Sequence, residues 1–303
     1  MLLFFIVLSD LQATHEFGDI RWQLLQIKVK EDRIKRVFDL LRSHEIEPVL
    51  IKGWAASLNY PTDVPRVYDD TDIAVADSDY RIAREVCNSE EASGLIIDLH
   101  RELRHMSSRP WDDLFRNSRL ISIDDTAIRI LRPEDHLQVL CVHWLTDGGA
   151  HKLRLWDIYY AVANRPADFD WERCLETIPE NRRRWIITTI GIANVYLGLN
   201  IDDLPFQEEA KSVPRWIKEC IESEWKSDVR LEPVIMHLRS PSSLLKQVLK
   251  RIPPNPIRST IEMEGRIEAR TRIFYQIGTL VKMLTHPFGP RPLLDRIKRR
   301  WNA

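Results

Sequence analysis

The segment from Trp22 to His44 carries apolar residues at helical spacing. These residues are Leu24, Leu25, Ile27, Ile34, Val37, Phe38 and Leu41. Side chains three and four positions apart lie on the same side of an α-helix, so the pattern predicts an amphipathic helix that packs one face against a core.

Shorter apolar runs follow between residues 49 and 131, and they predict strands. Val49–Lys52 is expected to be a buried strand that stops at Gly53, and Thr71–Val75 a second strand. The run "SGLIIDLH" predicts a third strand, and "RLISIDDTAIRIL" predicts a hairpin with its Asp-Asp pair at the turn. Helices are expected over "WAASLNY" and over "SDYRIAREVCN", the second of them capped by Ser78.

The pattern changes after Arg132, where helical spacing replaces the short runs. Pro133 opens "PEDHLQVLCVHWL" at a position where a helix tolerates proline. Further helices are predicted over Leu153–Ala163, Trp171–Leu175, Arg182–Leu199, Val213–Glu224 and Pro256–Leu284, with breaks at "SPSS" and "PPNP". The sequence therefore predicts an α+β fold, with an α/β domain over residues 1–131 and an all-helical domain over residues 132–303.

Composition narrows the classes of partner. The 303 residues include 44 Lys or Arg and 45 Asp or Glu, so the net charge of −1 gives no overall attraction to nucleic acid or acidic membranes. The four cysteines are scattered, which argues against a disulfide framework or a zinc cluster and favours a reducing compartment.

The first residues, "MLLFFIVLSD", are apolar but few. They lack a positive leading segment and a small-residue cleavage site, which argues against a signal peptide. Later apolar runs fall short of the roughly 20 residues that a membrane helix needs. A cytoplasmic protein without a membrane partner is therefore expected.

Acidic residues lie just before or within the second and third predicted strands. Asp70 and Asp72 are two apart, as are Asp98 and His100, and such pairs share one face of a strand. If the two strands are neighbours, three carboxylates meet at one edge of a sheet, and divalent cations would remove their repulsion. Mg²⁺, or Mn²⁺, prefers such oxygen ligands, and a pair of these ions serves displacement at phosphorus.

The Lys52-Gly53 step supports a phosphate ligand beside these carboxylates. Glycine lets backbone amides approach a phosphate closely, and the start of a following helix adds a favourable dipole. Lys52 and Arg66 would neutralise the phosphates, Arg66 through a forked set of donors. The expected partner is a nucleoside triphosphate.

The ordered motifs resemble a known family. "VLIKGWAASLNYP", an arginine, "DTDIAV", "IDLHREL", "LRPEDHLQVLCVH" and "LRLWDI" are similar to the uncharacterised bacterial nucleotidyltransferase family of the DNA polymerase β-like superfamily. The resemblance covers about Val49 to Ala163 and implies a nucleotidyltransferase fold, with a small mixed sheet followed by a helical domain that closes the cleft. This chain departs from the superfamily at Trp54, where a serine or glycine commonly follows the first glycine.

The resemblance also implies roles for individual residues. Asp70 and Asp72 would bind the catalytic metals, and Asp98 would be a third metal-binding carboxylate that also activates the hydroxyl of an acceptor. The remaining implied site residues are the nucleotide-binding Lys52, Gly53 and Arg66. His100 is expected to support the ligands from behind, with direct contact to substrate or metal as the open alternative.

The implied reaction moves a nucleoside monophosphate from an NTP to an acceptor hydroxyl and releases pyrophosphate. The acceptor could be a small molecule, a peptide, a protein or an RNA end. Two alternatives stay open: the same fold could transfer a sugar phosphate or phosphoryl group, or the chain could be a non-catalytic nucleotide sensor or antitoxin-like module. We expect His136, His143 and His151 to pack between helices rather than to bind zinc. The basic runs "NRRRW" and "RIKRRWNA" are expected to be solvated faces.

Overall fold

A computed structural model describes residues 20–66, 68–103, 109–229, 231, 234–237 and 240–285. The segments "MLLFFIVLSD" and "RIKRRWNA" lie outside the described residues. The chain forms two compact units that divide between His136 and Leu137. The predicted domain boundary after residue 131 stays a prediction, and each unit is described by itself.

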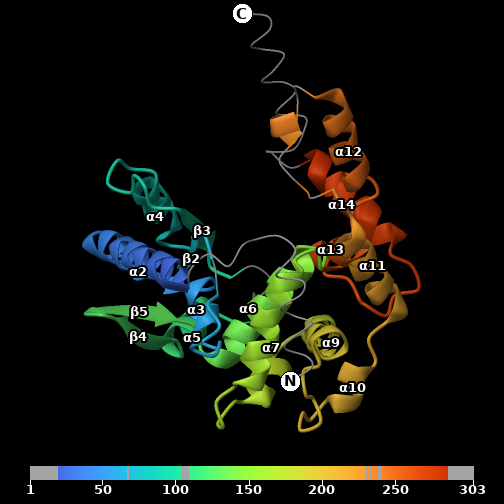
Figure 1. The fold of residues 1–303 in the computed structure, drawn as a ribbon, viewed down its shortest axis with the longest axis horizontal. Coiled ribbons are helices and arrows are strands. Elements are labelled where there is room, and N and C mark those ends of the chain that lie inside the picture. Colours follow the sequence, from blue (N-terminus) through green and yellow to red (C-terminus); the bar gives the residue numbers. More distant parts are fainter. Residues whose placement is uncertain are drawn as a thin grey trace, which may run out of the picture. The chain divides into compact units, whose positions relative to one another are not determined.

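The first unit is built on a five-stranded mixed sheet (Figure 1). Its strands lie in the order β3 (Ile97–Arg101), β2 (Thr71–Val75), β1 (Val49–Leu50), β5 (Thr126–Ile130) and β4 (Arg119–Ile123). Strand β1 pairs antiparallel with β2 and parallel with β5, β2 pairs parallel with β3, and β4 and β5 form an antiparallel hairpin. The predicted α+β fold is confirmed.

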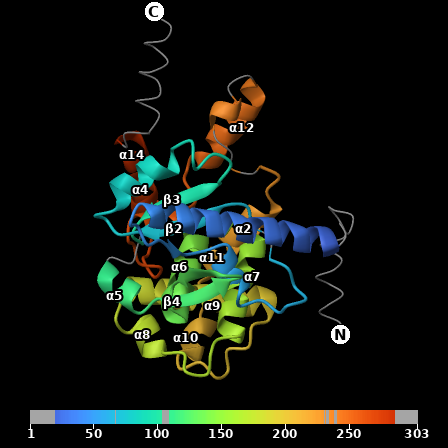
Figure 2. The same cartoon turned by 90° about the vertical axis from the view of Figure 1, so that its left-hand side faces the viewer.

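Helix α2 (Ile20–Ser43) packs against this sheet and crosses in front of it in Figure 2. Its predicted apolar face contributes Ile34, Val37, Phe38 and Leu41, all of them buried. They share one core cluster with side chains from β1, β2 and β5, which include Leu50, Ile73, Ile128 and Ile130. Burial of this face explains why the helix forms next to the sheet, because packing rather than propensity supplies most helix stability.

Two salt bridges hold α2 to the hairpin. Lys28 Nζ lies 2.9 Å from Asp124 Oδ1, and Lys35 Nζ lies 3.1 Å from Asp124 Oδ2. Asp124 sits at the predicted turn between β4 and β5 with a positive φ of 50°, which aspartate tolerates better than most residues. The hairpin prediction is confirmed.

Three local features of the first unit differ from the prediction. Strand β1 has only two residues and ends before Ile51. Helix α4 (Tyr80–Cys87) begins after Asp79 without a side-chain cap, and Ser78 Oγ is hydrogen-bonded to Asp79 Oδ1 instead of to the helix. Helix α5 (Trp111–Arg116) was not predicted, because its six residues are too few to show helical periodicity.

The second unit is helical, and the following helices make it up. They are α7 (Leu155–Ala163), α8 (Trp171–Leu175), α9 (Glu180–Leu197), α10 (Gln207–Lys211), α11 (Arg215–Lys226), α12 (Pro241–Arg251), α13 (Pro256–Glu262) and α14 (Ile273–Thr285), with short 3-10 helices η1 (Lys152–Arg154) and η2 (Val234–His237). Helix α6 (Pro133–Thr146) runs across the division into this unit and begins at the predicted proline. Trp144 and Trp185 are buried in the core of this unit.

Two predictions in the second unit are wrong. The single helix expected over Pro256–Leu284 is two helices, α13 and α14, separated by a segment in which Glu264 has a positive φ of 50°. The "SPSS" break is the start of α12, where Pro241 occupies the first turn that a proline can open.

The basic run "NRRRW" lies at the start of α9 and is neutralised by the chain itself. The guanidinium groups of Arg182, Arg183 and Arg184 lie 3.1, 2.7 and 2.6 Å from carboxylate oxygens of Glu264, Glu209 and Glu268. This run is therefore an ion-paired part of the helical unit rather than a solvated face available to a nucleic acid.

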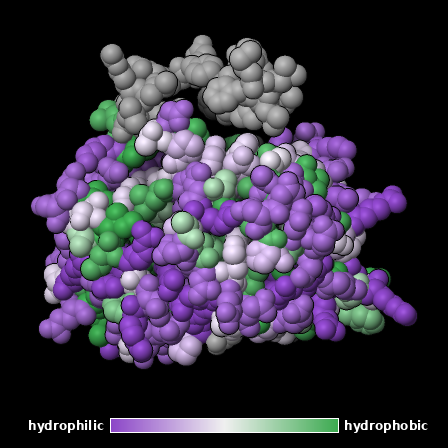
Figure 3. All heavy atoms as spheres, turned by 90° about the horizontal axis from the view of Figure 1, so that it is seen from below, coloured by the Kyte–Doolittle hydropathy of each residue, from purple (hydrophilic) through white to green (hydrophobic). Residues whose placement is uncertain are grey.

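Figure 3 shows a face of the molecule on which hydrophilic side chains predominate, with hydrophobic ones in smaller groups between them. This agrees with a sequence in which 29% of residues are charged. Within the part of the chain that the structure describes, every helix is too short or too polar to span a bilayer.

Candidate active site

The two strands that carry the acidic residues are neighbours in the sheet. Strands β2 and β3 pair in parallel with Asp72 directly opposite Asp98 and Ala74 directly opposite His100. Because side chains alternate along a strand, Asp72, Asp98 and His100 project from the same face of the sheet. Leu95, Ile97 and Leu99 pack on the core of the opposite face, which fixes this orientation.

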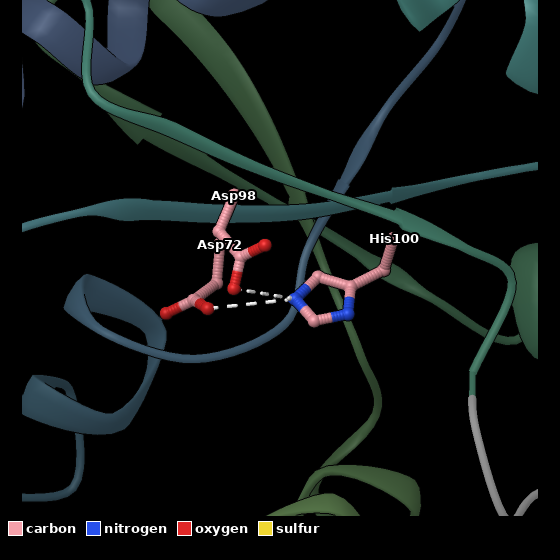
Figure 4. Close-up of side chains that lie close together, drawn as sticks. All are labelled: Asp72, Asp98 and His100. Atoms are coloured by element: carbon pink, nitrogen blue, oxygen red, sulfur yellow. Dashed lines mark ion pairs between the residues drawn. The ribbon is translucent and has the colours of Figure 1, made fainter. Parts of the chain in front are cut away.

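The three side chains converge on the ring nitrogen of the histidine (Figure 4). His100 Nε2 lies 3.2 Å from Asp98 Oδ2 and 3.5 Å from Asp72 Oδ1. Among the described residues, these three form the group of side-chain donors that could hold a metal ion. His143 lies elsewhere, with its Nε2 3.7 Å from Asp147 Oδ2.

Lys52 joins the same cluster from the end of β1. Its Nζ lies 2.7 Å from Asp72 Oδ1, and the Asp72 residue is only 5% exposed. Two cationic groups of the chain therefore lie beside the carboxylates, which corrects the expectation that their repulsion requires a bound metal. The case for a metal rests instead on the donor atoms.

The protonation states follow from these contacts. Burial by itself would raise the pKa of Asp72, but the contacts with His100 and Lys52 outweigh burial and hold that pKa well below its usual range. Burial by itself would lower the pKa of His100, but its contacts with Asp72 and Asp98 raise that pKa to about 9. At neutral pH without a metal, Asp72 is ionised and His100 is protonated.

The residues present fit a divalent cation. Asp72 Oδ1 and His100 Nε2 are both buried, and neither atom makes a hydrogen bond of acceptable geometry, so their close contacts are charge contacts only. Buried polar atoms are nearly always hydrogen-bonded, and an exception calls for an explanation such as an ion. Carboxylate and imidazole donors facing one point provide the ligands that divalent metals use.

Asp70 is placed differently from its predicted partners. It lies in a bend immediately before β2 and is half-buried, so the alternation of the strand does not extend to it. Within the described residues, the cluster contains Asp72, Asp98 and His100 and leaves Asp70 out. Its role as a metal ligand stays a prediction.

The turn at Gly53 packs against the loop that contains Asp70, immediately before β2. Gly53 has φ 59° and ψ −114°, a combination that only glycine adopts readily, and a Cβ at this position would lie 3.5 Å from the Asp70 carbonyl oxygen. Arg66 Nη1 donates a hydrogen bond of 3.0 Å to the Gly53 carbonyl oxygen and so ties the loop to the turn. The following helix α3 (Trp54–Ser57) has only four residues, so the dipole expected there is small.

Trp54 stands at the position where the resembling proteins commonly have serine or glycine, and its side chain packs in the core of the first unit. Its ring is buried in the core cluster, and its Nε1 donates a hydrogen bond of 3.1 Å to Glu31 Oε1 on α2. Lys30, the preceding residue on α2, donates a hydrogen bond to the Tyr68 carbonyl oxygen. Helix α2 therefore braces both the glycine turn and the loop before β2.

The sequence reasoning missed these braces from α2. One indication of these contacts was available from their position in the chain: Lys30 and Glu31 lie about one helical turn before Ile34, next to the apolar face of the predicted helix. Charged residues at such borders commonly extend into solvent, so position alone does not distinguish a brace from a solvated side chain.

Replacing Gly53 by alanine is expected to weaken nucleotide binding. The backbone conformation costs a non-glycine residue about 1–3 kcal/mol, and relaxing it would shift the turn against the Asp70 backbone. We expect a fall in melting temperature together with a loss of ATP affinity, measured by thermal shift and by calorimetry. The matched control is Gly94→Ala, which also has a positive φ, of 81°, but has no neighbouring atoms within 4 Å. An equal loss of affinity in both variants would contradict a role for the Gly53 turn.

Comparison with known proteins agrees with this site. The model of a family described as uncharacterised nucleotidyltransferases matches residues 21–188, which include all the residues of the cluster. Neither the curated proteins nor the solved structures contain a match to the chain.

Proposed function

The chain belongs to the family of uncharacterised nucleotidyltransferases, and from this premise we propose that it transfers a nucleoside monophosphate from an NTP to an acceptor hydroxyl. The acceptor oxygen attacks the α-phosphorus, the bond from that phosphorus to the β-bridging oxygen breaks, and pyrophosphate leaves. The proton of the hydroxyl passes to a carboxylate of the enzyme.

In this proposal the carboxylates bind the metal, and the turn at Lys52 and Gly53 binds the phosphates. Asp72 and Asp98, with the predicted contribution of Asp70, would hold divalent cations, Mg²⁺ or Mn²⁺, which when bound neutralise charge that develops on the phosphates. Lys52 would contact the phosphates from the end of β1, and Gly53 would let the backbone approach them. Arg66 would act at the same turn, through its bond to the Gly53 carbonyl oxygen.

Asp98 suits the role of the base that receives the proton. Its side chain is 51% exposed, so a carboxylate oxygen can reach an acceptor that enters from solvent while Oδ2 faces His100. Asp72 is 5% exposed and cannot approach an acceptor in the same way. The two carboxylates therefore differ in role because they differ in burial.

The observation that carries the proposal is the pairing of β2 with β3, because it sets Asp72 opposite Asp98 beside Lys52 in a chain of this family. The test is incubation of the purified protein with each α-³²P-labelled NTP, Mg²⁺ or Mn²⁺, and a cell extract. Label that moves onto a new species, with release of pyrophosphate, supports the proposal. Transfer of label from γ-³²P-ATP but never from α-³²P-ATP would indicate phosphoryl transfer, and nucleotide binding without any transfer would indicate a sensor.

A further inference from the structure

We infer that His100 is a direct ligand of the cation and that the resulting Asp–Asp–His donor set makes the site selective for Mn²⁺ over Mg²⁺. The inference rests on the proposed function in one respect, namely that the site takes a divalent cation. It adopts the alternative that the sequence left open, direct contact of His100 with the metal, in place of the expected supporting role behind the carboxylates.

The distances between the donors fit three ligands of one ion. Metal–ligand bonds of about 2.1 Å to oxygen or imidazole nitrogen place two ligands at right angles roughly 3 Å apart. His100 Nε2 lies 3.2 Å from Asp98 Oδ2 and 3.5 Å from Asp72 Oδ1. The three donor atoms all lie within 4.8 Å of one another, so side-chain rotations that draw them together would bring all three to one cation.

The strand pairing directs the ring to this place. His100 lies opposite Ala74 on β2, and a single methyl group at that position leaves the imidazole free to lean across the sheet toward Asp72. His100 Nε2, the ring nitrogen that faces the carboxylates, is buried and makes no hydrogen bond (Figure 4). The same holds for Asp72 Oδ1. A histidine with a purely packing role would commonly satisfy its buried nitrogen with a protein acceptor or donor.

The chemistry of the donor set gives the selectivity. Mg²⁺ keeps oxygen ligands almost exclusively and sheds its water reluctantly, whereas transition metals accept imidazole. Mn²⁺ also suits carboxylates and can take six ligands, so it satisfies both donor types and leaves positions for phosphate oxygens. Between the two ions that nucleotidyl transfer commonly uses, one imidazole with two carboxylates therefore favours Mn²⁺ over Mg²⁺.

A competing reading makes His100 a protonated counterion of the two carboxylates. The two readings differ in the sign of one effect. If His100 is only a counterion, its removal leaves Lys52 as the one cation beside the two carboxylates and strengthens the binding of any divalent cation. If His100 is a ligand, its removal weakens the binding of Mn²⁺ more than that of Mg²⁺.

The experiment is a titration of the full chain with MnCl₂, in which the electron paramagnetic resonance signal of free Mn²⁺ reports binding, followed by competition with MgCl₂. His100→Phe removes the donor, and His100→Asp replaces it with a third carboxylate. The matched control is His44→Phe, an exposed histidine in the turn after α2. Circular dichroism and thermal melts establish that each variant is folded.

We expect His100→Phe to weaken Mn²⁺ binding by at least about tenfold, since even the loss of an outer partner of a ligand costs 10–100-fold. Mg²⁺ binding should change less, His100→Asp should lower the ratio of Mn²⁺ to Mg²⁺ affinity, and His44→Phe should change neither. Electron spin-echo spectra of bound Mn²⁺ should show coupling to a nitrogen nucleus that His100→Asp abolishes.

Unchanged or tighter Mn²⁺ binding in folded His100→Phe, or no nitrogen coupling in the wild-type protein, would overturn the inference. If His100→Phe does not fold, the spectra of the wild type and of His100→Asp decide the question. Mn²⁺ binding with nitrogen coupling but without transfer of label would leave the inference standing while the proposed reaction fails, so the two failures are distinguishable.

Discussion

Asp72→Asn is expected to lower nucleotidyl transfer by about a thousandfold or more. The substitution keeps the shape of the side chain but removes its negative charge, so Lys52 loses its ion pair with Asp72, and His100 keeps only its contact with Asp98. A neutral amide binds a divalent cation poorly, and stabilisation of charge by the site supplies most of the rate of phosphoryl-type transfer. Initial rates of label transfer at saturating NTP and metal measure the effect, and Mn²⁺ titration should show a parallel loss of binding.

The control for this variant is Asp63→Asn, an exposed carboxylate in the loop before β2. It removes the same charge from the same unit and should leave transfer within about twofold of the wild type, as surface substitutions generally do. Because Asp72 is buried, its substitution is also checked by thermal melting, and Asp72→Glu provides a second variant that keeps the charge. A folded Asp72→Asn protein with near-normal transfer would remove Asp72 from the active site.

The sequence predicted the sheet best where hydrophobic alternation is strong. Strand β2 occupies the predicted residues, Thr71–Val75, because Ile73 and Val75 face the core cluster while Asp72 and Ala74 face the other way. The hairpin of β4 and β5 was predictable for a similar reason, since two alternating runs flank a pair of residues that tolerate a tight turn. Local pattern determines such elements.

Elements that depend on distant contacts were predicted less well. The local pattern separates α13 from α14 only weakly, through Gly265, because the residues between the two helices also include apolar positions. The four-residue α3 and the two-residue β1 are held by their neighbours rather than by their own propensity.

The candidate site was predictable in its strands and only in part in its contacts. The shared face of Asp98 and His100 could be anticipated from the alternation, whereas the pairing of β3 with β2 was only a condition of the prediction and its parallel direction was not predicted. The salt bridge from Lys52 to Asp72 could not, because it depends on where a flexible side chain turns after the end of β1. Asp70 was expected to share the strand, but the bend before Thr71 removes it from the alternation.

Substitution of Lys52 is expected to change metal binding and catalysis in opposite directions. Lys52→Met is expected to strengthen Mn²⁺ binding in the absence of nucleotide by about tenfold or more, while lowering kcat/KM for the NTP by about a hundredfold. In the structure the ammonium lies 2.7 Å from the Asp72 oxygen that a cation would bind, so lysine and metal compete for one carboxylate. Charges about 4 Å apart in a partly buried site interact by several kcal/mol, which is ample for the expected gain in metal affinity. With NTP bound, the same ammonium would neutralise phosphate, and its loss would raise the barrier to transfer.

Opposite changes in the two measurements separate this explanation from simple damage to the site. Damage would weaken metal binding and transfer together, whereas removal of a competing cation improves the first and impairs the second. Lys35→Met is the matched control, because Lys35 also pairs with a carboxylate of the first unit, Asp124, at 3.1 Å but on the hairpin turn. Weaker Mn²⁺ binding in folded Lys52→Met would mean that Lys52 holds Asp72 in position for the metal rather than occupying the place of the metal until nucleotide arrives.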